Sequence, residues 1–121
     1  MKLSGEQLSR IANEMVRIKA EHYGKGPVQA HAYQNGNIVF CVMKDGFTTV
    51  ERTLLKGGED QLVREVRLRF QDQMNETFRQ AVERIVDRKV LAFASQVVFD
   101  PDLVFEICVL DDGPPDLKQP D

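Results

Sequence analysis

The sequence lacks several features that would assign it to a common functional class. It contains no tryptophan and only two cysteines among 121 residues, and both Cys41 and Cys108 stand inside apolar runs. Buried free thiols are therefore expected rather than a disulfide framework. The N-terminus has no apolar signal segment, and no apolar run reaches the ~18 residues that a membrane span requires. We therefore expect a cytoplasmic protein without direct membrane insertion.

An excess of positive charge is also missing. The net charge is −3, and residues 111–121, with four Asp and one Lys, account for all of it. A protein held to nucleic acid by phosphate contacts needs clustered Lys and Arg, so the sequence predicts no nucleic-acid partner. It also predicts a single domain over residues 1–110, followed by a disordered, acidic, proline-rich tail over 111–121.

Patterns typical of catalysis, metal binding or cofactor binding are absent too. His31 has no second His or Cys at ligand spacing. Gly24-Lys25-Gly26-Pro27 lacks the spacing of a phosphate loop. Asp100-Pro101-Asp102 has no neighbouring group for hydrolytic chemistry and is interpreted as a turn. The sequence therefore predicts no catalytic residue, no metal site and no cofactor, and a protein that is not an enzyme.

Hydrophobic periodicity predicts two long helices. Apolar residues at gaps of three and four indicate a helix over about Ser4–His22, which the following Gly24 ends. A second apolar stripe runs without Gly or Pro from about Asp60 to Arg88, and it predicts a helix about 40 Å long.

The segment 47–56 is ambiguous between a strand and a helix. Val50 and Thr53 suit a strand. The Thr48-x-x-Glu51 spacing is instead that of a helical capping box. We favour a short helix over about Thr49–Lys56.

Four strands complete the pattern. Residues 28–34 alternate apolar and polar side chains, and Asn35-Gly36 predicts a hairpin turn. The return strand, Asn37–Lys44, contains an unbroken apolar run, which predicts a central strand covered on both sheet faces. A second hairpin is expected from strands over Lys89–Val98, with Val90, Ala92 and Ala94 on one face, and Leu103–Leu110.

The predicted fold class is α+β. Two hairpins form one four-stranded, mainly antiparallel sheet, and an N-terminal helix, a short helix and one long helix pack on it in a two-layer arrangement. The element order is α-β-β-α-α-β-β.

The long helix predicts an interface. A small four-stranded sheet is only ~20 Å wide, so part of the apolar stripe is expected to extend past the sheet and to need another surface. We predict a homodimer, with Phe70, Met74 and Phe78 at the interface.

Three arginines form the most informative polar cluster. If the short helix folds back on the start of the long one, Arg52, Arg64 and Arg67 could converge on an acidic group, since guanidinium suits carboxylate and phosphate. The alternative is a solvated face whose charges compensate one another. Small-anion binding is thus a second hypothesis for function.

The order and spacing of several short motifs resemble the MpsC-like domain, a small bacterial family. The resemblance covers about Leu8 to Leu110. It is carried by Gly24-Lys25-Gly26-Pro27, Glu51-Arg52-Thr53-Leu54, Arg64-Glu65-x-Arg67, Lys89-Val90-Leu91-Ala92-Phe93-x-Ser95, Asp100-Pro101-Asp102 and Val104-Phe105-Glu106-x-Cys108-Val109-Leu110.

The family label refers to a sodium-translocating, membrane-potential-generating system. The resemblance implies a soluble accessory role beside a membrane complex that handles ions or bicarbonate, with a protein partner at the membrane. It offers no catalytic residues, and a soluble domain of this size does not move sodium by itself. The leading hypothesis is therefore a non-enzymatic interaction or regulatory module.

Overall fold

The computed structural model describes residues 2–26, 29–44 and 46–111. The elements follow the predicted order: α1 (Gly5–Tyr23), β1 (Gln29–Asn35), β2 (Ile38–Lys44), α2 (Thr49–Lys56), α3 (Asp60–Val86), β3 (Val90–Val98) and β4 (Leu103–Leu110). The α+β prediction is confirmed, including the short helix at 49–56. Val28, Asp45 and the predicted tail from 112 onward lie outside the described residues.

Local chemistry explains where the first two helices begin. The Ser4 hydroxyl accepts from the Gln7 amide and the Gln7 side chain accepts from the Ser4 amide, which closes a capping box at α1. Thr48 and Glu51 do the same at α2. Each box satisfies backbone N–H groups that have no partner inside the helix. This local bonding decides the ambiguous segment in favour of a helix.

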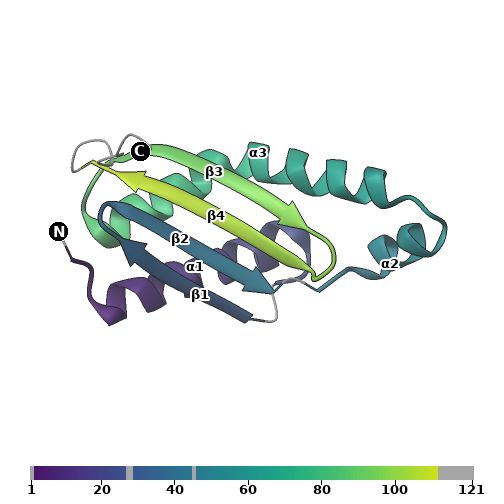
Figure 1. Ribbon diagram of the computed structural model, residues 1–121, viewed down its shortest axis with the longest axis horizontal. Helices are drawn as coiled ribbons and strands as arrows, with labels where there is room; N and C mark the ends of the chain where they lie inside the picture. Colours follow the sequence, from purple (N-terminus) through teal and green to yellow (C-terminus); the bar gives the residue numbers. More distant parts are fainter. Residues whose placement is uncertain (1, 27–28, 45, 112–121) are drawn as a thin grey trace, which may run out of the picture.

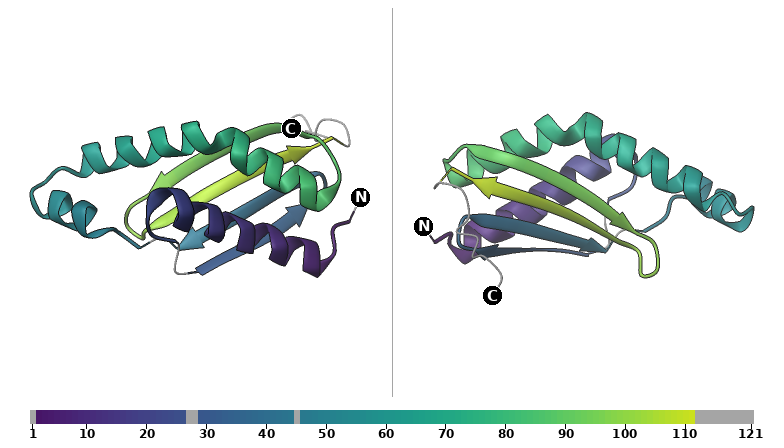
Figure 2. Two further views of the ribbon diagram at one scale, coloured as in Figure 1. Left: turned by 180° about the vertical axis from the view of Figure 1, so that it is seen from behind. Right: turned by 45° about the horizontal axis from the view of Figure 1, so that its top comes forward.

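The sheet has the order β1-β2-β4-β3, and every neighbouring pair is antiparallel. The two hairpins therefore meet through β2 and β4, which are the inner strands. Helices α1 and α3 lie side by side against one face of this sheet (Figure 2, left). The core between the layers includes Val39, Met43, Val104 and Leu110, none more than 1% exposed.

Helical cover is found on one face only. Figure 1 looks onto the other face, and in the described part of the chain no element crosses it. The expectation that β2 is covered on both sides is therefore wrong for the chain taken by itself. The reason is that α1 and α3 both pack against the same side of the sheet (Figure 2, left).

The third strand also differs from its prediction. The pairing of β3 with β4 shifts register between Val90 and Ala92. As a result Val90 is buried in the core, whereas Ala92 and Ala94 are exposed. The expectation that these three residues share a face is wrong, because a bulge inserts one residue and reverses the alternation.

The long helix extends past the sheet, as its length predicted. Figures 1 and 2 show the N-terminal part of α3 and the whole of α2 projecting beyond the ends of the strands. We call these two segments the arm. Leu62 and Val66, expected in the buried stripe, are 43% and 47% exposed. Val63, also expected in the stripe, is buried, but Arg67 and Gln71 occupy the other buried positions of this stretch.

Candidate functional site

The first candidate site surrounds Arg67, where the arm joins the domain. Arg67 is only 2% exposed. Its Nε donates to Glu51 Oε2 at 2.7 Å, and its Nη2 donates to Glu51 Oε1 at 3.0 Å. Its Nη1 donates to Asp102 Oδ1 at 3.1 Å. One guanidinium thus connects α3 to α2 and to the turn between β3 and β4.

Glu51 is bound from several sides. Tyr23, the last residue of α1, donates its hydroxyl to Glu51, and the Thr48 amide donates to it at 2.8 Å. Burial acts to raise the pKa of Glu51, but the hydrogen bonds from Arg67, Tyr23 and Thr48 outweigh it and hold that pKa at about 2. Burial and the contact with Glu51 raise the pKa of Tyr23. Glu51 is therefore an ionised structural acceptor.

The other two predicted arginines lie close by. Arg64 donates from Nη1 to the Val97 carbonyl at 2.8 Å, and its guanidinium lies 4.6 Å from the Phe99 ring centroid. Arg52 donates from Nη1 to the Phe47 carbonyl at 2.7 Å.

The rings of Phe47 and Phe99 meet edge to face, with 5.6 Å between their centroids. The Arg67 guanidinium carbon lies 4.6 Å from the Phe47 ring centroid. The structure therefore brings Arg52, Arg64 and Arg67 around one aromatic pair. All three guanidiniums donate to groups of the protein. Whether they also bind an anion stays a prediction.

The three predicted interface residues occupy different environments. Phe78 is 0% exposed and stacks on Phe93 of β3 at 6.0 Å. Phe70 is half-buried, with its ring edge to face with Tyr23 at 4.7 Å. Met74 is half-buried against the core. Phe78 belongs to the internal core in this structure, and the interface itself stays a prediction.

The sequence reasoning missed the second candidate site, which is the sheet face turned away from the helices. We call it the open face. Its centre consists of alternate residues of β2 and β4 that pair across the two strands, namely Ile38 with Val109, Phe40 with Ile107 and Val42 with Phe105. Ile107 is 39% exposed, and the other five are partly exposed.

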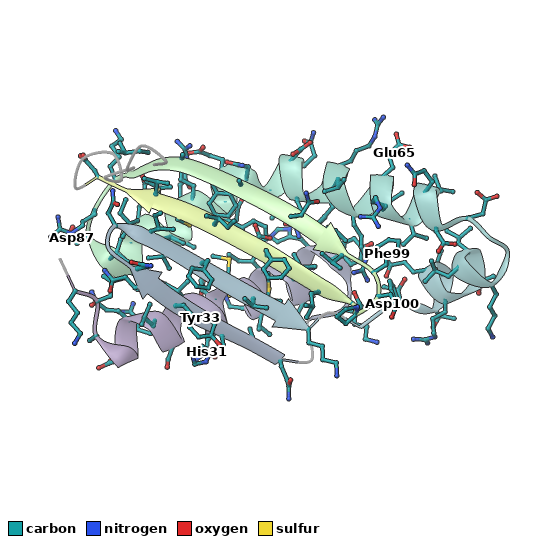
Figure 3. All side chains as sticks on the ribbon, in the orientation of Figure 1. His31, Tyr33, Glu65, Asp87, Phe99 and Asp100 are labelled. Carbon is teal, nitrogen blue, oxygen red and sulfur yellow. The ribbon has the colours of Figure 1, made fainter. Side chains whose placement is uncertain are left out.

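The edge strands extend the open face. On β1, Tyr33 is 45% exposed, and its ring stacks on that of Phe40 with 5.1 Å between the centroids. The ring centroids of His31 and Tyr33 are 4.5 Å apart. His31 and Tyr33 are labelled in Figure 3. On β3, Ala92 and Ala94 pair with β4. Among the described strand residues, this face carries no carboxylate. The signal for it was present in the unbroken apolar run of β2.

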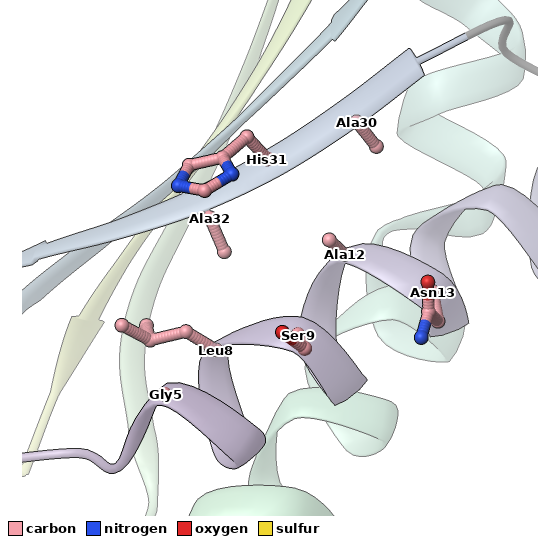
Figure 4. A pocket seen from close by; sticks show the side chains of 8 residues that line it. All are labelled: Gly5, Leu8, Ser9, Ala12, Asn13, Ala30, His31 and Ala32. Atoms are coloured by element: carbon pink, nitrogen blue, oxygen red, sulfur yellow. The ribbon is translucent and has the colours of Figure 1, made fainter.

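The remaining features of the described residues are weaker candidates for a functional site. A depression of about 360 Å³ lies between α1 and the edge strand β1. Small side chains line it, among them Ala12, Ala30 and Ala32, and His31 points away from the helix (Figure 4). Within residues 2–26, 29–44 and 46–111, no three His, Cys, Asp or Glu side chains are grouped to hold a metal.

The two cysteines are free and buried, as predicted. Both side chains belong to the layer between sheet and helices, where Glu106 is also buried and accepts from Ser95. Burial, with a smaller effect of the Glu106 charge, raises the pKa of both thiols to about 12. These thiols are therefore protonated at neutral pH and unsuited to nucleophilic chemistry.

Comparison with known proteins gives one family. The family model described as "Na+-translocating membrane potential-generating system (MpsC)" matches residues 4–112. No curated protein and no solved structure matches the chain. In the described residues no helix is both long and apolar enough to cross a membrane. Because the match extends over almost all of the folded chain, this protein belongs to the MpsC family.

Proposed function

We propose that this chain is a non-enzymatic interaction module, an accessory protein of the membrane potential-generating system named in its family description. The open face carries this proposal. An apolar surface spanning two inner strands is unfavourable in water, and contiguous exposed apolar patches of this kind typically mark interaction sites. The chain covers its other sheet face with α1 and α3. The open face has no such cover, and we take it as the side that binds a partner.

The polar chemistry of the molecule supports a binding role. The buried Arg67 forms ion pairs with Glu51 and Asp102 where the arm joins the domain. The Cys41 and Cys108 thiols are buried. These groups are engaged within the fold, and the open face stays exposed to a partner.

The proposal takes the chain as cytoplasmic, with a protein partner at the membrane and no insertion of its own. The family description supports an assembly that includes ion-translocating subunits. An ion- or bicarbonate-handling complex is the membrane system that the proposal favours.

Site-specific photo-crosslinking in cells tests this function. A photoreactive residue at position 107 lies on the open face, and one at Glu65, whose side chain is 54% exposed on α3, serves as the control. We expect a discrete adduct from position 107, either with another copy of the chain or with a subunit of a membrane complex, and none from position 65. An absence of adducts from position 107 in cells would contradict the proposal.

The alternative is a small-anion binding domain that uses Arg52, Arg64 and Arg67. No further observation favours it, and the contacts of these three side chains with protein groups compete with it. It stays a prediction.

A further inference from the structure

The open face has a size and composition that fit a specific occupant. Four strands of about seven residues give a sheet roughly 19 Å by 24 Å. Its flat footprint is thus about 450 Å², more than half of the ~800 Å² that each partner buries in a standard interface. The centre is uncharged and apolar, as in homodimer interfaces.

Large and small side chains are distributed unevenly across this face. The register places Tyr33, Phe40, Ile107 and Ala94 in one row that crosses β1, β2, β4 and β3 in that order. The row therefore begins with two stacked aromatic rings and ends with a methyl group. In this row the β1 end protrudes and the β3 end is low.

We propose that a second copy of this chain occupies the open face, with the two-fold axis lying between the sheets and parallel to the strands. Such an axis sets β1 of one copy over β3 of the other. Tyr33 then lies over Ala94 of the second copy, and Phe40 lies over Ile107 of the second copy. In this row the protruding end of each copy fills the low end of the other, and each contact occurs twice, as a two-fold interface requires.

The positions of two opposite charges, on Lys44 and Asp100, are consistent with the same two-fold axis. Lys44 ends β2 beside Leu103, the first residue of β4, so it lies at the end of the sheet that carries the β3–β4 turn. A two-fold axis parallel to the strands brings Lys44 toward that turn in the second copy. The exposed Asp100 of that turn (Figure 3) supplies an opposite charge at the rim, where it favours register more than affinity.

Other occupants fit less well. Residues 112–121 contain one large apolar side chain, Leu117, and three prolines, too little apolar surface to cover two strands. A two-fold sheet-on-sheet contact buries both open faces at once, with the layers about 10 Å apart. The arms and the helices of both copies stay on the outside of this dimer.

Sedimentation equilibrium of the purified full chain, from about 1 to 100 μM, tests this inference. We expect a dimer, and we expect Ile107→Lys to raise its dissociation constant at least about 100-fold because two buried charges enter each interface. Val66→Lys, which adds the same charge at an exposed position on α3, serves as the matched control and should leave the dimer intact. Far-UV circular dichroism confirms that each variant is folded.

A swap of bulk tests the axis even if Ile107→Lys fails to fold. Ala94→Tyr alone should weaken the dimer at least tenfold, since it places a ring against Tyr33 of the second copy. Adding Tyr33→Ala to Ala94→Tyr should restore most of the affinity. A swap that restores nothing would overturn the proposed axis.

A wild-type chain that is monomeric at 100 μM would overturn the inference, as would a dimer dissociated by Val66→Lys but not by Ile107→Lys. The inference rests on the proposed function, because it names the occupant of the surface that function uses. The two fail separately: a monomeric chain whose position 107 still crosslinks to a membrane subunit would reject the second copy and keep the interaction module.

Discussion

Arg67 and Glu51 form a two-point ion pair at a position where neither residue is more than 5% exposed. The pair joins the two helices of the arm, and Asp102 ties it to the β3–β4 turn. A buried ion pair often adds little net stability compared with apolar packing, but removing one partner leaves an uncompensated charge. The pair therefore fixes where the arm points, and its loss is costly.

The first prediction concerns the loss of one partner of this pair. Glu51→Gln should lower the free energy of unfolding by about 3 kcal/mol, because it leaves the Arg67 guanidinium buried with a weaker acceptor. Urea denaturation measures the change. Glu65→Gln breaks the exposed Glu65–Arg69 pair and should cost less than about 0.5 kcal/mol. Equal losses in the two variants would show that the buried pair has no special role.

The second prediction concerns pH. The pKa of Glu51 falls from an ordinary value of 4.5 to about 2 on folding. A depressed carboxyl pKa gives stability that is fully present above pH 4.5 and is lost as the pH falls from 4.5 toward 2. Denaturation curves of the wild type and Glu51→Gln should therefore converge over this window. A difference in stability that stays constant from pH 7 to pH 2.5 would refute the assignment.

The third prediction concerns Phe78 as a core residue. Phe78→Ala should lower the free energy of unfolding by about 3–5 kcal/mol, since it removes a ring that is fully buried against Phe93. Thermal and urea unfolding measure the loss. Leu62→Ala, at an exposed position on the same helix, is the control and should cost less than about 1 kcal/mol. A small loss of unfolding free energy in Phe78→Ala would argue against a core position and favour Phe78 as an interface residue.

The fourth prediction concerns the thiols. Cys41 and Cys108 are each 2% exposed, and burial raises the pKa of both to about 12. A thiol-specific chromogenic reagent at pH 8 should therefore react slowly with the native protein, at a rate limited by unfolding. The same protein in urea should release two equivalents promptly. Fast reaction of either cysteine in the native state would contradict the buried placement.

Much of the fold followed from local patterns in the sequence. The Thr48-x-x-Glu51 box, the Asn35-Gly36 turn and the apolar gaps of α1 each act within a few residues, so they predict elements without knowledge of the neighbours. The sequence pointed to Arg52, Arg64 and Arg67 as a group, and Arg67 does bond two carboxylates, Glu51 and Asp102; a role of the three arginines in ligand binding stays a prediction.

The buried face of α3 was not predictable in the same way. Hydrophobicity favours Leu62 and Val66 at the buried positions, yet Arg67 and Gln71 occupy them. A buried arginine is tolerated only when its acceptors are in place, and two of those acceptors, Glu51 and Asp102, lie 16 and 35 residues away in the chain. The hydrophobic pattern of one helix therefore carries no information about these distant acceptors.

The sequence by itself determined the element order, the helix ends and the apolar character of β2 and β4, because these depend on short-range spacing and composition. Only the tertiary structure decided on which side of the sheet the helices pack, and hence that one apolar face is covered and the other is open. That choice depends on contacts between elements far apart in the chain, such as those of α1 with β1 and of α3 with β3. The unbroken apolar run of β2 led to the prediction of two covered faces. Within the chain α1 and α3 cover one of them, and the cover of the other by a second copy is our proposal.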